Sequence, residues 1–440
     1  MKNRRVTTLV LILLFACSLV SCKRLSNNKN GDITNENDGP VNIGVYNMYD
    51  LETYMTPIWD GRVVHNETVM FLGMDDEVSL LFDADEILSV RSYDLKTEYQ
   101  QGIDYDYVDG KLVLLDGTSI PCIDKSEYYT SNDQYSALVT KGNSEPDATG
   151  AYTYWGEGDT MTKWQVAVTY KHSQFWDGYS VECFADKHQD LVKKLQNGED
   201  VTFVFYGDSI TYGANASFMV GVEPNMPTWP LMFAQYIAKQ YGYTVRYVKD
   251  EFSTAPVPTE DTVYGTNGTI TYYNPSVGGW SVEQGYQNIE NYVNAAIDKY
   301  GCDLFTVAFG MNNAALSAKK FVQYAEGIIE RVLKHAPETD IVMVSTMVPN
   351  PEATNGWYGN QDQFEAEMIA SADTYYQNGT NCSVACMTSM SVSVLGKKRF
   401  RDYTGNNINH PNDFMSRLYA QVMVETVFGY ENLLEVDFAE

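Results

Sequence analysis

The most informative part of the 440-residue chain is Val201-Thr-Phe-Val-Phe-Tyr206, which runs directly into Gly207-Asp208-Ser209-Ile210-Thr211. A short apolar run bounded by turn residues is typical of a strand that is buried on both faces. A glycine at the end of such a strand lets the backbone turn sharply, so that Ser209 is aimed into a crevice. Because Gly-Asp-Ser also occurs in ordinary turns, its meaning depends on the rest of the chain.

Downstream of about Asp190 the sequence alternates between strand and helix patterns. The predicted strands are Val201–Tyr206, Thr244–Val248, Leu304–Phe309, Ile341–Ser345 and Val384–Met387. The predicted helices are Leu191–Asn197, Trp229–Tyr241, Val282–Tyr300, Ala318–His335, Gln361–Gln377 and Asp413–Phe428. Such alternation predicts an α/β region in which helices cover both faces of a parallel sheet. Ligands of these sheets bind outside the carboxyl ends of the strands.

Upstream, residues 42–190 show almost no helical periodicity. Short apolar or alternating runs are separated by turn residues, at Val69–Leu72, Val78–Phe82, Glu86–Tyr93, Lys111–Leu115 and Trp164–Tyr170. Asp109-Gly110 predicts a tight hairpin. The pattern fits two packed antiparallel sheets in an all-β, jelly-roll-like sandwich.

The N-terminus has the features of an export signal. Lys2, Arg4 and Arg5 precede an apolar run over Leu9–Val20, which is short for a membrane span, and Cys22 follows at the expected cleavage point. Residues 1–22 are therefore predicted to be a lipoprotein signal peptide with a lipobox at Cys22; the alternative is an ordinary signal peptide with an incidental cysteine.

Residues 23–41 are rich in Asn, Asp, Gly and Ser, which predicts a flexible tether. The folded part then comprises a β-sandwich domain (42–190) and an α/β domain (191–440). The expected location is that of an exported bacterial lipoprotein, periplasmic or at the cell surface and held to the membrane by lipid only.

Charge and cysteine content restrict the partners. Lys plus Arg number 30 against 58 Asp plus Glu, a net charge of −28, which argues against nucleic acid and against charge-driven binding to anionic membranes. No cysteine spacing resembles a zinc site, so no metal is expected. Cys382 and Cys386 are spaced for a possible disulfide, although small buried hydrophobes explain most of the cysteines better.

Three further segments lie where polar chemistry is expected. Asn274-Pro-Ser-Val-Gly-Gly-Trp-Ser281 has paired glycines that free backbone N–H groups. Phe309-Gly310-Met311-Asn312-Asn313 follows a predicted strand and offers side-chain amides, or helix caps. His410 precedes the last predicted helix.

The order Ser, Gly, Asn, His, each in its own loop, resembles the SGNH (GDSL-type) hydrolase superfamily over about residues 200–430. That resemblance implies a flavodoxin-like three-layer fold and a carboxylic ester hydrolase without cofactor or metal. It places the nucleophile at Ser209 and the general base at His410, because a serine hydroxyl needs an adjacent base. It places the oxyanion hole at the N–H of Ser209, the N–H of Gly279 and the side chain of Asn312.

Two positions depart from the family pattern. The third block usually ends in Asp but has Asn313 here, and the acid three residues before the histidine is Asn407. An Asn can orient imidazole through its carbonyl oxygen but supplies no charge. Three interpretations stay open: a Ser–His dyad oriented by Asn407 or a backbone carbonyl, which is preferred; a different acid such as Asp402 or Asp413; or a weakened enzyme.

The leading hypothesis for the substrate is acylated, most simply acetylated, carbohydrate. Superfamily members with an N-terminal β-sandwich resemble bacterial carbohydrate esterases, and an exported enzyme meets polysaccharide. Trp280 and Trp357 are predicted to stack on sugar rings, with packing inside the loops as the alternative. The other hypotheses are a lipase, lysophospholipase or thioesterase of the same superfamily, and a non-catalytic glycan-binding lipoprotein, for which Asn407 is the favouring feature.

Overall fold

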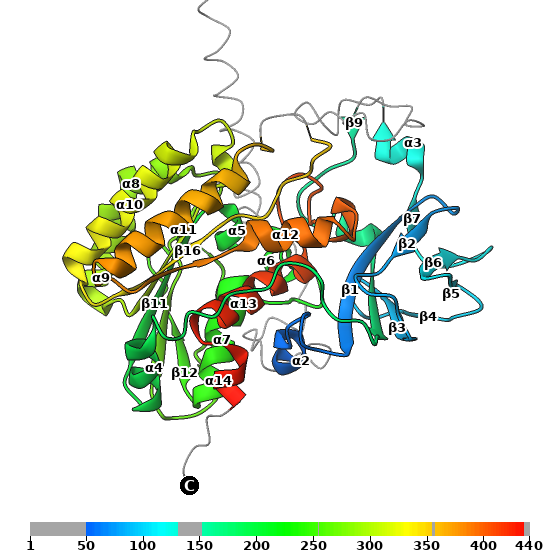
Figure 1. Cartoon of the computed structure of the whole chain (residues 1–440). Coiled ribbons are helices and arrows are strands. Elements are labelled where there is room, and N and C mark those ends of the chain that lie inside the picture. The colour runs from blue at the N-terminus through cyan, green and yellow to red at the C-terminus, as the bar shows by residue number, and fades with distance from the viewer. Residues whose placement is uncertain (1–49, 131–151, 254, 354–356, 435–440) are drawn as a thin grey trace, which may run out of the picture. The chain divides into compact units, whose positions relative to one another are not determined.

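The structure, a computed structural model, describes residues 50–130, 152–253, 255–353 and 357–434. The predicted signal peptide, the lipobox Cys22 and the tether lie outside the described residues. The described residues belong to one compact unit, in which a sheet-rich β region is followed by an α/β region (Figure 1).

The β region contains two principal sheets. Its larger sheet has the order β4-β3-β10-β1-β7, where β1 pairs antiparallel with β10 and parallel with β7. A second sheet has the order β2-β6-β5, and β8 pairs with β9. The strands are β1 (Val63–Leu72), β2 (Glu77–Ser79), β3 (Glu86–Ser92), β4 (Glu98–Tyr99), β5 (Tyr105–Val108), β6 (Lys111–Leu114), β7 (Cys122–Ile123), β8 (Tyr129–Thr130), β9 (Tyr152–Thr153) and β10 (Gln165–Lys171).

The predicted hairpin is confirmed. β5 and β6 pair antiparallel, and the two residues between them, Asp109 and Gly110, have φ angles of 51° and 78°. Positive φ at both positions is the geometry that favours Asp-Gly in a two-residue turn. Helical segments in this region are short: α2 (Leu51–Met55), α3 (Lys125–Tyr128) and η3 (Thr162–Trp164).

The α/β region is built on a seven-stranded mixed sheet with the order β13-β12-β14-β11-β15-β16-β17. All neighbours pair in parallel except β13, which runs antiparallel to β12 at the edge. The strands are β11 (Val201–Gly207), β12 (Thr244–Tyr247), β13 (Thr262–Val263), β14 (Thr269–Tyr273), β15 (Leu304–Ala308), β16 (Asp340–Val344) and β17 (Cys382–Ala385).

β14 corrects the sequence-based expectation for this part. The sequence pattern predicts an excursion over 250–273 with Asn267-Gly268 as a hairpin turn. Instead Asn267 and Gly268 connect β13 to β14, which do not pair with each other, and β14 inserts between β12 and β11 as an interior strand.

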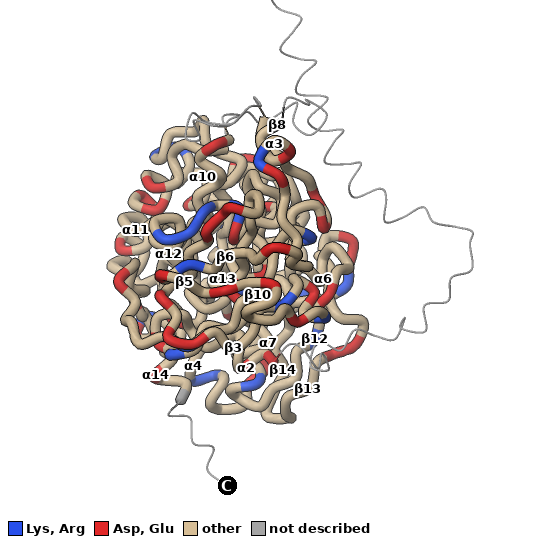
Figure 2. Tube along the Cα trace, turned by 90° about the vertical axis from the view of Figure 1, so that its right-hand side faces the viewer, with Lys and Arg blue, Asp and Glu red and all other residues tan. Residues whose placement is uncertain are grey.

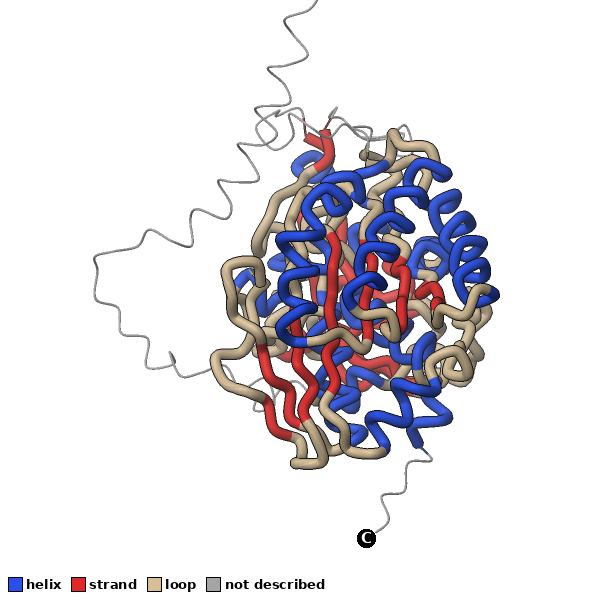
Figure 3. The backbone as a smooth tube through the Cα atoms, turned by 90° about the vertical axis from the view of Figure 1, so that its left-hand side faces the viewer, coloured by secondary structure: helices blue, strands red, loops and turns tan. Residues whose placement is uncertain are grey.

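Helices cover both faces of this sheet, as Figure 3 shows from the side. On β11, Phe203 and Phe205 contact the rings of Phe233 and Trp229 on α7, while Val204 and Tyr206 belong to the core under α8 and α10. The helices are α4 (Gln189–Gln196), α5 (Ser209–Tyr212), α6 (Ser217–Val220), α7 (Trp229–Tyr241), α8 (Val282–Ile289), α9 (Ala295–Tyr300), α10 (Ala318–His335), α11 (Gln361–Gln377), α12 (Met387–Leu395), α13 (Asp413–Val427) and α14 (Tyr430–Leu434). Shorter turns of helix are η4 (Glu290–Asn294), η5 (Met311–Asn313) and η6 (Phe400–Asp402).

Two predicted elements differ in detail. The helix predicted over Val282–Tyr300 contains a π-helical segment, η4, between α8 and α9. The strand predicted at Val384–Met387 begins and ends earlier, as β17, and Met387 opens α12 instead.

Cysteines and membrane-spanning potential can be stated for the described ranges. Cys382 and Cys386, the candidate disulfide, are both free thiols, as are the remaining described cysteines. Within these ranges no helix combines the length and apolar character needed to cross a bilayer.

Candidate active site

Ser209 lies at the carboxyl end of β11, where α5 begins. Asp208 caps that helix, with Oδ1 accepting a hydrogen bond from the Ile210 N–H at 3.0 Å. A Cβ on Gly207 would lie 2.3 Å from Thr211 Oγ1 and 2.4 Å from the carbonyl oxygen of Ala308. Only glycine therefore fits the turn that presents Ser209.

The second loop follows β14, the neighbour of β11. Trp280 N–H donates to Val277 O at 3.3 Å, closing a turn in which Gly279 has φ +78°. The turn is tied to the first loop, because Val277 N–H donates to Gly207 O at 3.1 Å. A Cβ on Gly278 would lie 3.8 Å from Ser209 Cβ, so the glycine pair passes beside the serine.

The third loop follows β15, the other neighbour of β11. Asn312 Nδ2 donates to Trp280 O at 3.0 Å, which fixes the amide against the glycine turn. Asn313 differs from the family's Asp, but its Oδ1 accepts from Val282 N–H at 3.1 Å at the start of α8. An amide oxygen can fill that acceptor role, without the charge of a carboxylate.

His410 completes the group, since its Nε2 lies 2.9 Å from Ser209 Oγ. Ser209 is buried, with 6% of its surface exposed, and the His410 side chain is 12% exposed. The structure thus brings together the loops of Ser209, Gly279, Asn312 and His410, which span two hundred residues of sequence.

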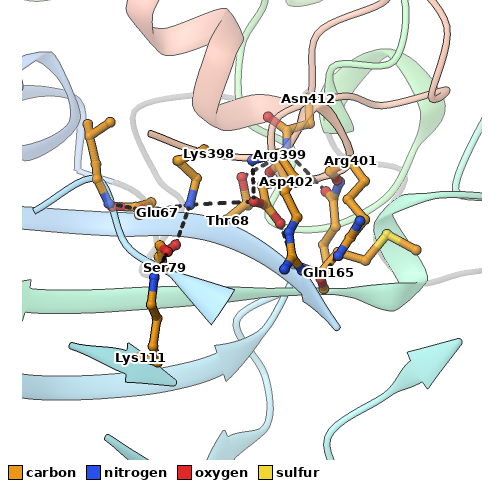
Figure 4. A network of polar contacts seen from close by, with 12 residues as sticks. Glu67, Thr68, Ser79, Lys111, Gln165, Lys398, Arg399, Arg401, Asp402 and Asn412 are labelled. Atoms are coloured by element: carbon orange, nitrogen blue, oxygen red, sulfur yellow. Dashed lines mark hydrogen bonds and ion pairs between the residues drawn. The ribbon is translucent and has the colours of Figure 1, made fainter. Parts of the chain in front are cut away.

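The loop that carries His410 is held by strands of the β region (Figure 4). Asn412 Nδ2 donates to Thr68 Oγ1 on β1 at 2.8 Å and to Gln165 Oε1 on β10 at 3.0 Å. Gln165 Nε2 in turn donates to the carbonyl oxygens of Arg401 and Thr404, at 2.8 Å each. The position of the histidine therefore depends on the β region.

A buried ion pair lies in the same contact between the β region and the α/β region. Lys398 pairs with Glu67 of β1, and both side chains are fully buried. Glu67 also accepts from the Leu81 N–H and from the Tyr170 hydroxyl, at 2.9 and 2.6 Å. The basic stretch after α12, visible in blue beside that label in Figure 2, is ion-paired: Lys397 with Asp177, Lys398 with Glu67, Arg399 and Arg401 with Asp76.

Asn407 does not orient His410, which corrects the preferred interpretation of the sequence. Its backbone has φ +64°, and its fully buried side chain bonds to Tyr128 Oη and to the carbonyl oxygen of Tyr154 at 2.8 and 2.7 Å. It also accepts from Asn350 Nδ2 at 3.2 Å. Asn407 therefore anchors the loop to the β region.

The alternative acids, Asp402 and Asp413, also form hydrogen bonds with groups other than His410. Asp402 Oδ1 accepts from Met70 N–H at 2.9 Å, and Asp413 Oδ1 accepts from Ser217 N–H at 2.8 Å. Around His410 Nδ1 stand three residues that sequence reasoning missed: Asn215 Oδ1 at 2.8 Å, Asn406 Nδ2 at 3.0 Å and Glu157 Oε2 at 3.2 Å.

The electrostatics of the site follow from these contacts. Burial lowers the pKa of His410, but the charge of Glu157, its hydrogen bond to the ring and the charge of Asp208 together raise the pKa above its usual value. Burial raises the pKa of Asp208 to about 6, against smaller lowering effects of the Ile210 N–H and of His410.

Both predicted substrate-binding tryptophans are half-buried. The Trp280 ring packs edge-on against Tyr292, with centroids 4.8 Å apart, at the margin of the sheet core. Trp357, like Trp155 of the β region, packs against a small cluster of Ala353 and Ile408; Ile408 lies two residues before His410. Among the described residues no cluster of three or more His, Cys, Asp or Glu side chains is arranged to hold a metal ion.

Comparison with protein families finds that residues 203–408 match the GDSL-like Lipase/Acylhydrolase model. This stretch of the chain is therefore similar to the GDSL acylhydrolases. The matched range includes Ser209, Gly279 and Asn312 but ends before His410 and does not reach Glu157.

Comparison with curated proteins finds no match. Among solved structures, the chain is similar to a two-domain esterase active on acetylated mannans, crystallised with mannopentaose (16% identity, 55% of this chain and 52% of that chain, TM-score 0.38). It is also similar to a protein described as a GDSL-like lipase from Parabacteroides merdae (16%, 52% and 95%, 0.36). A third is a catalytic mutant of an acetylxylan esterase from Geobacillus stearothermophilus (11%, 51% and 92%, 0.34). The chain spans 52% and 57% of the first two matched structures, both of the mannan esterase.

Proposed function

We propose that this protein is a serine esterase that removes acyl groups, most simply acetyl, from carbohydrate. The observation that carries the catalytic part is the 2.9 Å contact between Ser209 Oγ and His410 Nε2, beside the glycine turn. A hydroxyl within hydrogen-bond reach of an imidazole is the arrangement that activates serine as a nucleophile.

The proposed reaction has two halves. Ser209 Oγ attacks the ester carbonyl while His410 Nε2 takes its proton, and the carbonyl oxygen becomes an oxyanion stabilised by the N–H groups of Ser209 and Gly279 and by Asn312. Collapse breaks the ester C–O bond, and His410 returns the proton to the leaving alkoxide. Water then attacks the acyl-enzyme with His410 again as base, releasing the carboxylic acid and Ser209.

The carbohydrate substrate is supported by the aromatic side chains of the site. Trp357 and Trp155 both pack against the small apolar cluster of Ala353 and Ile408, next to the loop of the proposed general base, and both residues are partly exposed. Flat aromatic faces at the margin of a concave site suit sugar rings. Trp280, beside the oxyanion turn, is the second proposed contact, through the exposed part of its ring.

The proposal also includes the cellular location of the protein and the fold of its β region. Lys2, Arg4, Arg5, the apolar run and Cys22 support export and lipid anchoring, with the enzyme facing periplasmic or surface polysaccharide. The two sheets of the β region support a jelly-roll-like sandwich as its fold.

The test uses purified full-length mature protein with p-nitrophenyl acetate, p-nitrophenyl octanoate and acetylated xylan or mannan. We expect acetate release from the polysaccharide, a preference for the short ester and a loss of at least ~10³-fold in Ser209→Ala. Ser383→Ala, at a buried serine that also contacts a histidine, is the matched control. A preference for octanoate would favour a lipase, and polysaccharide binding without turnover would favour a glycan-binding protein.

A further inference from the structure

The hydrogen bonds of Asn406 determine which atoms can accept a hydrogen bond from the Nδ1–H group of His410. Asn406 Oδ1 accepts from the N–H groups of Ile408, Asn409 and His410, at 3.0 Å each, which fixes the orientation of the amide. Its Nδ2 donates to Asn409 Oδ1 and Glu157 Oε1, both at 3.0 Å. Both hydrogens of Asn406 Nδ2 therefore have acceptors other than His410. His410 Nδ1 can thus carry a proton and donate it in a hydrogen bond to a neighbouring oxygen.

Asn215 supplies the nearer oxygen. Its Nδ2 donates to the carbonyl oxygens of Gly158 and Gly405, at 3.2 and 3.3 Å, so its Oδ1 is the atom that faces His410 Nδ1 at 2.8 Å. Asn215 is almost completely buried and has φ +65°, a conformation that Asn tolerates better than most residues. This neutral acceptor selects the tautomer in which Nε2 is free to accept the Ser209 proton.

Glu157 supplies the only carboxylate found at this nitrogen among the described residues, with Oε2 3.2 Å from Nδ1. It comes from the β region, in the loop between β9 and η3. The loop is fastened on both sides of Glu157: Gly156 N–H donates to Asn406 O at 3.3 Å, and Gly158 O accepts from Asn215.

We propose that Asn215 and Glu157 together replace the missing acid of the family: Asn215 holds the tautomer of His410, and Glu157, contributed by the β region, stabilises the imidazolium. This inference rests on the proposed function and makes the β region part of the catalytic apparatus. Both are positioning residues, because they act through His410. The Glu157 side chain is 42% exposed, so solvent screens its charge and the effect is smaller than that of a buried Asp.

The direction of the pH effect follows from the groups that face His410, namely Glu157 at Nδ1 and, more weakly, Asp208. His410 must be neutral to act as a base, so activity falls below the pKa of its ring. The Glu157 carboxylate raises that pKa, and removing it moves the acid limb of the kcat/KM profile to lower pH.

The experiment compares Glu157→Gln and Glu157→Asp with Asp159→Asn, an exposed carboxylate two residues along the same loop. We expect kcat/KM of Glu157→Gln to fall about 10- to 100-fold. This is less than the ~10⁴-fold loss that follows replacement of the triad Asp by Asn in a serine protease, where the histidine also takes the wrong tautomer. Its acid limb should shift to lower pH, Glu157→Asp should recover part of both effects, and Asp159→Asn should change neither.

A second readout does not depend on esterase activity. The ring of His410, assigned by comparison with His410→Gln, is titrated by NMR in the wild type and in Glu157→Gln. A lower pKa in the variant is expected. If Ser209→Ala inactivates the enzyme but Glu157→Gln changes neither the pKa of His410 nor the acid limb of the kcat/KM profile, the role of Glu157 is overturned. The proposed function would then remain intact. A wild type without turnover but with the expected NMR shift would overturn the function alone.

Discussion

His188 Nε2 lies 2.8 Å from Ser383 Oγ, and His188 Nδ1 lies 3.0 Å from Asp340 Oδ2, so the molecule contains a second Ser–His–carboxylate chain. The contacts match those of a hydrolase triad, but all three residues are buried, with His188 completely inaccessible. Asp340 and Ser383 also lie at the amino ends of β16 and β17, away from the carboxyl edge where ligands of such sheets bind. Accessibility and position therefore assign this chain to the core.

The two serines predict different reactivity toward a fluorophosphonate probe. Ser209 should be phosphonylated, because it adjoins both the base and the glycine turn, whereas Ser383 should not react in folded protein. Mass spectrometry of the digested protein measures the adduct on each peptide. Labelling should disappear in Ser209→Ala and persist in Ser383→Ala; an adduct on Ser383 under native conditions would contradict the assignment.

The close packing of Gly405 against Asn215 predicts a catalytic defect from a single added methyl group. A Cβ on Gly405 would lie 2.4 Å from Asn215 Cβ and 2.9 Å from Pro411 O, so Gly405→Ala must displace Asn215 or the His410 loop. Because misplacement by about 1 Å can cost ~10²-fold, we expect kcat to fall at least tenfold with KM less affected. Gly396→Ala, whose Cβ would meet nothing closer than 3.4 Å, is the control. Equal kcat values for the two variants would argue against a positioning role for Asn215.

The sequence predicts which loops lie at one edge of the sheet where a loop follows a strongly patterned strand. Ser209 and Asn312 come directly after the apolar runs of β11 and β15, and their placement at one edge follows from the alternation of strands and helices. The interior position of β14 does not follow from the sequence, because Thr269-Ile-Thr-Tyr-Tyr273 alternates polar and apolar residues, whereas an interior parallel strand is typically apolar throughout.

Glu157 could not be found in this way. It is separated from His410 by 253 residues and sits between two glycines in a loop without periodicity. The one available signal was indirect: Asn at position 407 implies that any negative charge comes from elsewhere. Conversely, the spacing of Asn407 before the histidine suggested a role that its positive φ and its bonds to Tyr128 and Tyr154 rule out.

The buried carboxyl of Asp208 predicts a pH-dependent stability. Its pKa is raised from 3.8 to about 6, so the folded state binds the proton more tightly than the unfolded state. Stability is therefore favoured at low pH and falls as the pH rises between about 4 and 6, by roughly 3 kcal/mol. Asp208→Asn retains an oxygen for the Ile210 N–H and should be more stable than the wild type at pH 7.5 but not at pH 4. Denaturant unfolding at both values measures this; an equal difference at the two pH values would contradict it.

The Lys398–Glu67 pair predicts a large difference between two adjacent lysines. Lys398→Met leaves the fully buried Glu67 without its counter-ion, which should cost about 3–5 kcal/mol of unfolding free energy. Lys397→Met removes an exposed pair with Asp177, whose side chain is 74% exposed, and should cost under ~1 kcal/mol. Urea unfolding measures both variants. A small effect at Lys398 would mean that Glu67 is neutralised by other means.

The proposed oxyanion role of Asn312 predicts a lower kcat with little change in KM. Asn312 Nδ2 is fixed by its bond to Trp280 O, and the second hydrogen of the same nitrogen remains to stabilise the charge that develops on the substrate carbonyl. Asn312→Ala should therefore lower kcat by ~10²–10³ while KM changes little, because the donor acts mainly in the transition state. Asn313→Ala removes the acceptor for the Val282 N–H and should lower the unfolding free energy by about 1 kcal/mol, with a smaller effect on kcat. Steady-state kinetics with p-nitrophenyl acetate and urea unfolding separate the two. A rise in KM with an unchanged kcat in Asn312→Ala would instead assign this amide to substrate binding.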